Sequence, residues 1–387
     1  MSDPDSHGRQ VTEFFREKFG ASPSAVFRAP GRINIIGEHT DYNDGFVLPM
    51  AIRSSTWVAV SPREDRALQA YSEQYSDPVR LALGNLSGPP TKHWSDFVRG
   101  VAAVLQQNGL ALPGANLAIR SDVPIGGGLS SSASLEVSLA LALASVAGSA
   151  VSPLVLAKLC QQAEHEYVGT RCGIMDQFVA VLGAAGCALL LDCRSLEKQP
   201  IRVPPEVRFV AVNSMVRHEL SSGEYNLRRA DCAAGVKLLQ AVIPHIRALR
   251  DVGREDIERH KSVLPAKVYR RCRHVVSENL RVLEAANALR SNNPTELGKL
   301  MCQSHVSLRD DYEVSCTELD LLVELSSSKP GVYGARMMGG GFGGCTINLV
   351  HSDLVEQFRS DISRLYKERT GITPETYVCE PGEGASV

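Results

Sequence analysis

Residues Pro124-Ile-Gly-Gly-Gly-Leu-Ser-Ser-Ser-Ala-Ser134 join three consecutive glycines to a run of serines. A strand-like segment precedes them at residues 115–123, and an apolar segment of helical character follows at about residues 135–147. Glycines let backbone approach a ligand closely, and the unpaired N–H groups at a helix start favour an anion. This order is typical of a phosphate-binding loop, although not of a Walker A loop, because no Lys follows the glycines. A glycine turn capped by serines is the alternative.

Composition and charge narrow the class of protein. The 387 residues are too many for one small core and indicate two domains. A net charge of −2 gives no electrostatic reason to expect nucleic acid or an anionic membrane as a partner. The ten cysteines include no Cys-x-x-Cys pair, which favours a reduced, cytoplasmic protein without disulfides or structural zinc. Residues 2–6 are polar and acidic, so we expect no signal peptide.

Hydrophobic periodicity predicts strands mainly in the first half of the chain and helices mainly in the second. Antiparallel strands are expected at residues 56–61, 67–71 and 79–83. Helices are expected at residues 11–19, 94–107, 135–147, 152–167, 225–241, 268–289, 294–308, 317–327 and 354–369. The helix at 135–147 belongs to the most apolar stretch, but Glu136 and the lack of basic flanks indicate a buried helix rather than a membrane span. The proline-bounded segment 200–205 is the best boundary, dividing the chain into domains at 1–205 and 206–387.

A dense polar cluster lies in Gly31-Arg-Ile-Asn-Ile-Ile-Gly-Glu-His-Thr-Asp-Tyr-Asn43, between apolar half-strands. Its charged or titratable members include Arg32, Glu38, His39 and Asp41. Carboxylates and an imidazole together suit a polyhydroxylated ligand, because each sugar hydroxyl needs donors and acceptors. A solvated hairpin loop is the alternative.

Two further carboxylates stand in unusual positions. Glu164 lies near the end of a predicted helix, where the helix dipole disfavours a negative charge, so it indicates either a cation partner or a surface salt bridge. Asp176, in Cys172-Gly-Ile-Met-Asp-Gln-Phe178, lies among apolar residues after a glycine. It is interpreted either as a helix N-cap or as a buried carboxylate held for catalysis.

A second glycine cluster, Gly334-Ala-Arg-Met-Met-Gly-Gly-Gly-Phe-Gly-Gly-Cys345, formally contains the dinucleotide-binding pattern Gly-x-Gly-x-x-Gly. It lies too near the C-terminal end for the rest of such a fold, and a strand rather than a helix is expected after it. We interpret it as a glycine-packed wall of a nucleotide and sugar site.

Taken in order, the three motifs resemble the galactokinase family, within the superfamily of galacto-, homoserine, mevalonate and phosphomevalonate kinases. The resemblance runs from about Phe27 to Val350 and includes residues 172–178, 221–229 and 304–316. The phosphate loop alone would indicate only the superfamily, and the first motif narrows it to galactokinase. Thr40 and Asn43 are kept where sister enzymes for N-acetylgalactosamine diverge.

The resemblance implies two α+β domains with mixed sheets and packed helices and an active site in the interdomain cleft. It also implies ATP-dependent phosphorylation of D-galactose at its anomeric hydroxyl, with Asp176 as base and Arg32 keeping it ionised and offsetting transition-state charge. The implied sugar site comprises Arg32, Glu38, His39, Thr40, Asp41, Gly173, Asp176 and Tyr225. The implied ATP site comprises Gly126, Gly127, Gly128, Leu129, Ser130, Ser131 and Ser132, with Trp94 near the adenine. Ser132 and Glu164 would hold Mg²⁺.

One residue departs from the family pattern, and two alternative functions stay open. Met338 stands where the family usually has Thr, and we expect this change to affect packing rather than chemistry. A regulatory sensor that binds galactose and ATP without turnover is one alternative, but such relatives have lost a Ser-Ala pair that this chain keeps as Ser132-Ala133. A kinase for another sugar of the superfamily is the other. Galactose and ATP are the expected partners, with no nucleic acid, membrane or obligate protein partner evident.

Overall fold

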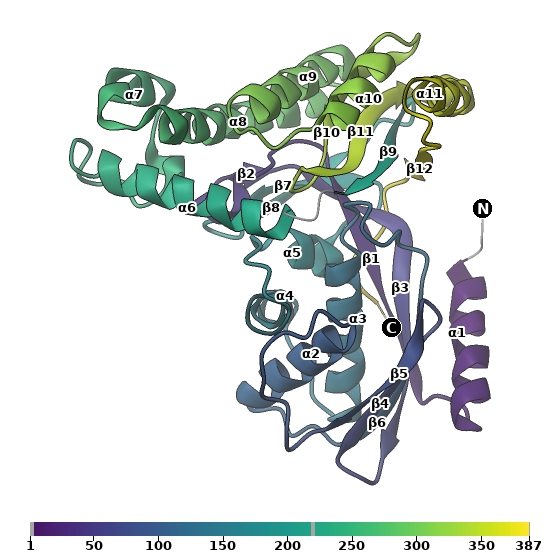
Figure 1. Cartoon of the computed structure of the whole chain (residues 1–387). Coiled ribbons are helices and arrows are strands. Elements are labelled where there is room, and N and C mark those ends of the chain that lie inside the picture. The colour runs from purple at the N-terminus through teal and green to yellow at the C-terminus, as the bar shows by residue number, and fades with distance from the viewer. Residues whose placement is uncertain (1–3, 218–220, 387) are drawn as a thin grey trace.

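The computed structural model of the chain describes residues 4–217 and 221–386. Figure 1 shows two groups of elements set at an angle to each other, one formed by the first half of the chain and one by the second. Residues 2 and 3 of the polar N-terminal segment, where no signal peptide is expected, lie outside the described residues.

The first half is built on a five-stranded sheet in the order β1-β3-β6-β4-β5. Its strands are β1 Ala25–Asn34, β3 Pro49–Arg63, β4 Ala67–Ser72, β5 Tyr75–Ala82 and β6 Gly114–Ser121. Neighbouring strands pair antiparallel except β4 and β6, which run parallel. β4 and β5 pair antiparallel, as expected, but β3 and β4 are not neighbours, because β6 returns after an intervening helix and inserts between them.

Helices cover both faces of this sheet, since both faces are apolar (Figure 1). They are α1 Pro4–Phe19, α2 Ser95–Gln107, α3 Ser131–Val146, α4 Pro153–Ala163 and α5 Met175–Leu182. α1 packs Val11 and Phe15 against Trp57 on one face, whereas α2 and α3 pack on the other. The predicted helix after the glycine loop is confirmed, but it begins at Ser131, so the serines of the loop form its first turn.

The second half contains a four-stranded antiparallel sheet in the order β10-β11-β9-β12. Its strands are β9 Val207–Arg217, β10 Val332–Met337, β11 Gly343–His351 and β12 Glu375–Cys379. Its helices are α6 Ser221–Leu239, α7 Arg254–Arg259, α8 Ala266–Arg290, α9 Pro294–Asp310, α10 Thr317–Ser327 and α11 Val355–Thr370. Side chains alternate along β9: Phe209 packs toward α8 and α9, whereas Val210 packs toward α10 and α11.

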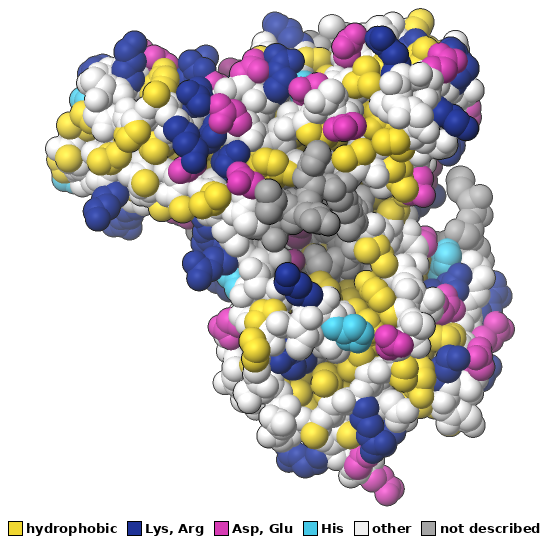
Figure 2. Space-filling model, viewed as in Figure 1, with side chains coloured by type: hydrophobic (Ala, Val, Ile, Leu, Met, Phe, Trp, Pro, Cys, Tyr) yellow, Lys and Arg dark blue, Asp and Glu magenta, His cyan; other side chains and the backbone are white. Residues whose placement is uncertain are grey.

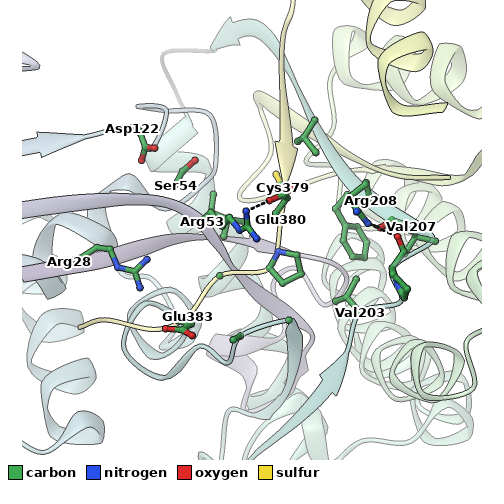
Figure 3. Close-up of a pocket in the computed structure, with 18 of the residues that line it drawn as sticks. Arg28, Arg53, Ser54, Asp122, Val203, Val207, Arg208, Cys379, Glu380 and Glu383 are labelled. Atoms are coloured by element: carbon green, nitrogen blue, oxygen red, sulfur yellow. Dashed lines mark hydrogen bonds and ion pairs between the residues drawn. The ribbon is translucent and has the colours of Figure 1, made fainter. Parts of the chain in front are cut away.

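The two halves are joined by more than the chain connection at residues 203–206. A small sheet of β2 Phe46–Val47, β7 Cys187–Asp192 and β8 Lys198–Arg202 lies between them. After β12 the chain returns to the first half, where Gly384 N donates to Gly183 O (3.0 Å) and Ser386 N donates to Arg28 O (2.9 Å). Figure 3 shows Glu380 of this returning segment paired with Arg53 (2.7 Å). The domain division at residue 205 stays a prediction.

These elements confirm an α+β fold with packed helices, and the five-stranded sheet is mixed. The placement of the active site in an interdomain cleft stays a prediction. In the described part of the chain, no helix has the length and apolar character needed to cross a membrane. On the face shown in Figure 2, basic, acidic and hydrophobic side chains are intermixed.

Candidate active site

Three glycine-containing segments that are far apart in the sequence meet at one place. The backbone N–H of Arg32 donates to Leu129 O (3.0 Å), which joins β1 to the glycine–serine loop. A Cβ atom on Gly31 would lie 2.7 Å from the same carbonyl oxygen, so a glycine is needed for this approach. A Cβ atom on Gly339 would lie 3.9 Å from Gly128 Cα, which places the second glycine cluster against the loop.

Asp176 lies at this meeting point in the first turn of α5. Arg32 holds its carboxylate in a two-pronged ion pair, with Nε to Oδ1 at 2.8 Å and Nη2 to Oδ2 at 2.7 Å. Ser130 Oγ also donates to Oδ2 (2.5 Å), and Arg32 Nη1 donates to Gly128 O (2.6 Å). The N-cap interpretation of Asp176 was wrong, because Ile174 occupies that position. The expectation that Arg32 lies beside Asp176 is confirmed.

The glycine–serine loop presents the start of α3 without a side-chain cap. Gly126, Gly128 and Ser130 all have positive φ angles of 59–70°, which turn the backbone sharply before the helix. Ser130 is the N-cap residue, yet its side chain makes no capping hydrogen bond and binds Asp176 instead. The serine-capped turn is therefore not what forms here. The first N–H groups of a long helix remain available to an anion.

Glu164 begins a single π-helical turn, Glu164–Val168, directly after α4. Its side chain is buried, 7 % exposed, so the surface salt-bridge interpretation was wrong. Gln177 Nε2 donates to its Oε2 atom (2.6 Å), and Cys172 Sγ approaches the same oxygen (3.4 Å). Ser132 lies near the same carboxylate, because it lowers the pKa of Glu164 and so offsets part of the effect of burial. The two residues expected to hold a metal ion are thus neighbours.

Further carboxylates crowd around Glu164. Gln177 Nε2 also donates to Glu136 Oε2 (3.0 Å), and Glu136 is fully buried. Burial raises the pKa of Glu164, and the charge of Asp176 raises it further. Burial likewise raises the pKa of Glu136, with the charge of Glu164 adding to it. Within residues 4–217 and 221–386, no group of three or more His, Cys, Asp and Glu side chains is arranged to hold a metal ion by itself.

Glu38, expected to line a sugar, is 3 % exposed and already bound by protein donors. Its Oε2 atom accepts hydrogen bonds from Asn34 Nδ2 (2.8 Å) and from the guanidinium of Arg336, and its Oε1 atom accepts from Gly339 N (3.0 Å). Arg336 is completely buried in β10. Glu38 therefore connects the first motif to the second glycine cluster, and its role toward a sugar stays a prediction.

The side chains of Thr40 and Asp41 make different contacts. The Thr40 hydroxyl is buried against the carbonyl oxygens of Gly37 (2.8 Å) and Phe46 (2.6 Å), so it closes the turn. Asp41 lies against Gly173, where an added Cβ atom would be 1.9 Å from its Oδ2 atom. Burial raises the pKa of Asp41 to about 7, and the charge of Asp176 contributes to this increase.

Aromatic rings surround His39, which is 4 % exposed. The centroid of its ring lies 5.5 Å from that of Tyr225 and 4.6 Å from that of Tyr312. Tyr225 in turn lies against the second glycine cluster, because a Cβ atom on Gly340 would be 3.3 Å from its ring. His39, Asp41, Gly173 and Tyr225 are thus neighbours of the Arg32–Asp176 pair or of each other, as the resemblance implies.

Two other residues singled out in the sequence lie in the hydrophobic cores. Trp94 is 4 % exposed, stacks on Tyr75 (5.5 Å between ring centroids) and donates to Asp77 O (3.2 Å), so the geometry gives its adenine assignment no support. Met338 is 1 % exposed and packs in the core that also contains Ile33. Its side chain therefore contributes packing, as expected for this departure from the family pattern.

Sequence reasoning missed several residues that build the site. They are Tyr42, Glu136, Gln177, Arg336 and Tyr312. Arg336 carried the clearest signal, because a charged residue in the middle of an apolar strand needs a buried partner. Tyr42 lies only three positions from His39, within the first motif. The partners of Glu136, Gln177 and Tyr312 lie in other segments, so their spacing in the sequence gave no indication of a role.

A cavity of about 1120 Å³ lies elsewhere, between β3, the start of β9 and the returning C-terminal segment (Figure 3). Its walls include Arg28, Arg53, Asp122, Arg208 and Glu383, and none of the site residues expected from the sequence. The residues expected from the motifs therefore gather around the Arg32–Asp176 pair and do not line this cavity.

Comparison with known proteins matches the chain along most of its length. The model described as the galactokinase galactose-binding signature matches residues 13–62, and those of the GHMP kinase N-terminal and C-terminal domains match residues 96–184 and 285–368. The galactokinase of Chloroflexus aggregans is 47 % identical over 96 % of this chain and 95 % of that protein. The human galactokinase is 44 % identical over 96 % and 94 %.

Solved structures agree. The Lactococcus lactis galactokinase complexed with galactose superimposes with a TM-score of 0.93 and 36 % identity, covering 98 % of this chain and 99 % of that one. The mevalonate kinase of Methanococcus jannaschii superimposes with a TM-score of 0.62 at 18 % identity, covering 93 % and 98 %, which indicates a shared fold.

The buried Glu38–Arg336 pair gives a prediction about stability. Arg336→Met should lower the free energy of unfolding by about 3–5 kcal/mol, because it leaves the Glu38 carboxylate buried without its cation. Urea unfolding followed by circular dichroism measures this change. The double variant Glu38→Gln/Arg336→Met should recover part of the loss, since no uncompensated charge remains. A loss below about 1 kcal/mol, the size of a surface pair, would contradict the bracing role.

Proposed function

The chain belongs to the galactokinase family, and on this basis we propose that it transfers the terminal phosphoryl group of ATP to the anomeric hydroxyl of D-galactose. The product is α-D-galactose 1-phosphate. The observation that carries this proposal is the Arg32–Asp176 pair, which lies where the sugar motif and the phosphate loop meet. A base beside an anion-binding helix start is what phosphorylation of a hydroxyl requires.

Asp176 accepts the proton of the attacking hydroxyl in this proposal. Both of its oxygens already accept hydrogen bonds, but Oδ1 receives only the one from Arg32 and keeps lone-pair capacity for the sugar. Arg32 fixes the plane of the carboxylate with its forked guanidinium, and its charge offsets negative charge that develops on the transferred group. Ser130 donates to the same carboxylate from the loop, so the base is joined directly to the phosphate loop.

The phosphates of ATP lie on residues 126–132 in this proposal. Gly126 to Ser132 present backbone N–H groups and hydroxyls at the start of α3, and the helix dipole favours the negative charge there. Most of the rate enhancement then comes from holding the two substrates in line and from neutralising charge.

Ser132 and Glu164 are the residues that would hold Mg²⁺. The site suits such an ion because Glu164 is buried, lies near Ser132 and is crowded by like charges that a divalent cation would neutralise. Hard oxygen ligands, few of them from protein, are what Mg²⁺ prefers when phosphates complete its shell. Mg²⁺ bound there would neutralise phosphate charge during transfer. Gln177 fixes the Glu164 side chain in place.

The sugar contacts His39, Asp41, Gly173 and Tyr225 in this proposal. The space between Asp41 and Gly173 is too narrow for a Cβ atom, so the Asp41 carboxylate packs directly against the backbone of Gly173. Glu38 and Thr40 act mainly by shaping the loop, since their polar atoms are already bound within the protein.

No observation favours the sensor or the kinase for another sugar. Ser132-Ala133, Glu164 and Asp176 are all present, and Asp176 is held in a two-pronged pair. We also propose a cytoplasmic location, because all ten cysteines are free, as in a reducing compartment. Galactose and ATP are the proposed partners.

The substrate is tested by ADP release with galactose, glucose, N-acetylgalactosamine and mevalonate. Galactose should exceed glucose by about 10⁴-fold in kcat/KM, because a site that pairs each hydroxyl rejects an isomer that leaves a buried group unmatched. Equal turnover of galactose and glucose would reject the sugar assignment, and binding of galactose without ADP release would favour the sensor.

Asp176→Asn tests the base. Asn keeps the shape but cannot accept the proton, so turnover should fall by about 10²–10⁴-fold while galactose binding changes little. Asp310→Asn, at an exposed surface pair, is the control and should behave as the parent. Steady-state kinetics with calorimetric galactose binding measure both, and a folded Asp176→Asn protein with parental turnover would remove Asp176 from the chemistry.

Glu164→Gln tests the metal. The Mg²⁺ concentration for half-maximal rate should rise by about tenfold or more, because even partners behind a metal ligand typically contribute that much. Galactose affinity, measured by calorimetry, should stay nearly unchanged. Glu166→Gln, two residues away and exposed, is the matched control. An unchanged Mg²⁺ titration in the folded Glu164→Gln protein would exclude Glu164 as a ligand.

A further inference from the structure

Behind His39 lies a line of hydrogen-bonding side chains that ends in the core. His39 Nδ1 is 2.7 Å from Tyr42 Oη, which is 2.9 Å from Tyr312 Oη, which is 3.2 Å from Cys232 Sγ. Tyr312 and Cys232 are fully buried. The four groups therefore form one continuous chain that runs from the proposed sugar site into the protein.

The far end of this chain is rigid. Tyr312 has its ring 4.6 Å from that of His274, and its backbone oxygen accepts a hydrogen bond from Arg228 Nε (2.9 Å). His274 is itself fixed, because it hydrogen-bonds Ser307 (2.9 Å) and Glu38 O (3.2 Å). A hydroxyl that is held on one side has little freedom, so the position of Tyr42 Oη is set by Tyr312.

The near end of the chain is incomplete. His39 Nε2 is buried and has no hydrogen-bond partner within the protein. A buried nitrogen of this kind costs free energy unless a ligand pairs with it. Burial lowers the pKa of His39 well below its usual value, and His274 and Arg228 lower it further. A neutral imidazole has one donor and one acceptor nitrogen, so the state of Nδ1 decides what Nε2 offers.

We propose that Tyr42, held by Tyr312, is a positioning residue that fixes the ring orientation and tautomer of His39, so that its Nε2 atom pairs with one hydroxyl of galactose. This inference rests on the proposed function. Each hydroxyl has a single proton, so the donor and acceptor roles of Tyr312, Tyr42 and His39 are linked: the role of one group fixes the role of the next. His39 Nε2 therefore acts toward the sugar either always as a donor or always as an acceptor. A sugar that lacks the matching hydroxyl loses that hydrogen bond.

Tyr42→Phe removes the hydroxyl and keeps the ring, which also contacts Tyr225 (5.5 Å between centroids). We expect the KM for galactose to rise about five- to tenfold, the size of one hydrogen bond, with the KM for MgATP unchanged. Tyr312→Phe should act in the same direction but more weakly. Tyr71→Phe, in strand β4 of the five-stranded sheet, is the control and should match the parent.

Specificity provides the readout that a purely structural role would not move. kcat/KM is measured for galactose and its 2-, 3-, 4- and 6-deoxy analogues in the parent, Tyr42→Phe, His39→Gln and the double variant. We expect one analogue to be discriminated less in Tyr42→Phe than in the parent, and the double variant to resemble His39→Gln. Fully additive losses, or an unchanged discrimination pattern in folded Tyr42→Phe, would overturn the proposal.

The controls separate this inference from the proposed function. If the parent protein does not phosphorylate galactose, the proposed function fails. If His39→Gln alters galactose use but Tyr42→Phe and Tyr312→Phe do not, only the positioning role fails. Calorimetric galactose binding checks that a change in KM reflects affinity, and thermal unfolding checks that each variant is folded.

Discussion

The buried ion pair between Glu38 and Arg336 connects the two halves of the molecule beside the candidate site. Arg336 also donates to the backbone oxygens of Asn34 (2.9 Å) and Ile35 (2.8 Å), so its guanidinium is fastened to the end of β1 and the loop that follows. Such a pair is stable only when both charges and their hydrogen bonds are in place. Because Gly339 binds the same carboxylate, the position of the second glycine cluster depends on this contact. The approach of that cluster to the phosphate loop depends on it in turn.

Crowded acidic groups are the second constraint. Glu136, Glu164 and Asp176 raise one another's energy, because like charges repel strongly where water is excluded. The protein offsets part of this with the Arg32 guanidinium and the Gln177 amide. In the proposed reaction the remaining repulsion favours binding, since a site crowded with carboxylates attracts a divalent cation and the phosphates that accompany it.

The residues of the first motif have different structural roles. Thr40 closes a turn, Glu38 joins the two halves, and Tyr42 hydrogen-bonds His39, whereas Asp41 and His39 contact the sugar in the proposed function. A signature shared by a family therefore mixes supporting residues with contacting ones. The distinction follows from which polar atoms are already bound within the protein, and the buried, unpaired Nε2 atom of His39 is the clearest mark of a contacting group.

The sequence by itself determined most of the local elements and the family. The glycine loop, the helix after it and the strand after Gly341 follow from short-range patterns, because turns and periodicity depend on neighbours in the chain. The three motifs also indicated the family. Only the tertiary structure decided which donor meets which carboxylate, since Arg32 and Asp176 are 144 positions apart. Trp94 and Met338 lie in the cores for the same reason: burial is set by segments that are distant in sequence and meet only in the folded chain.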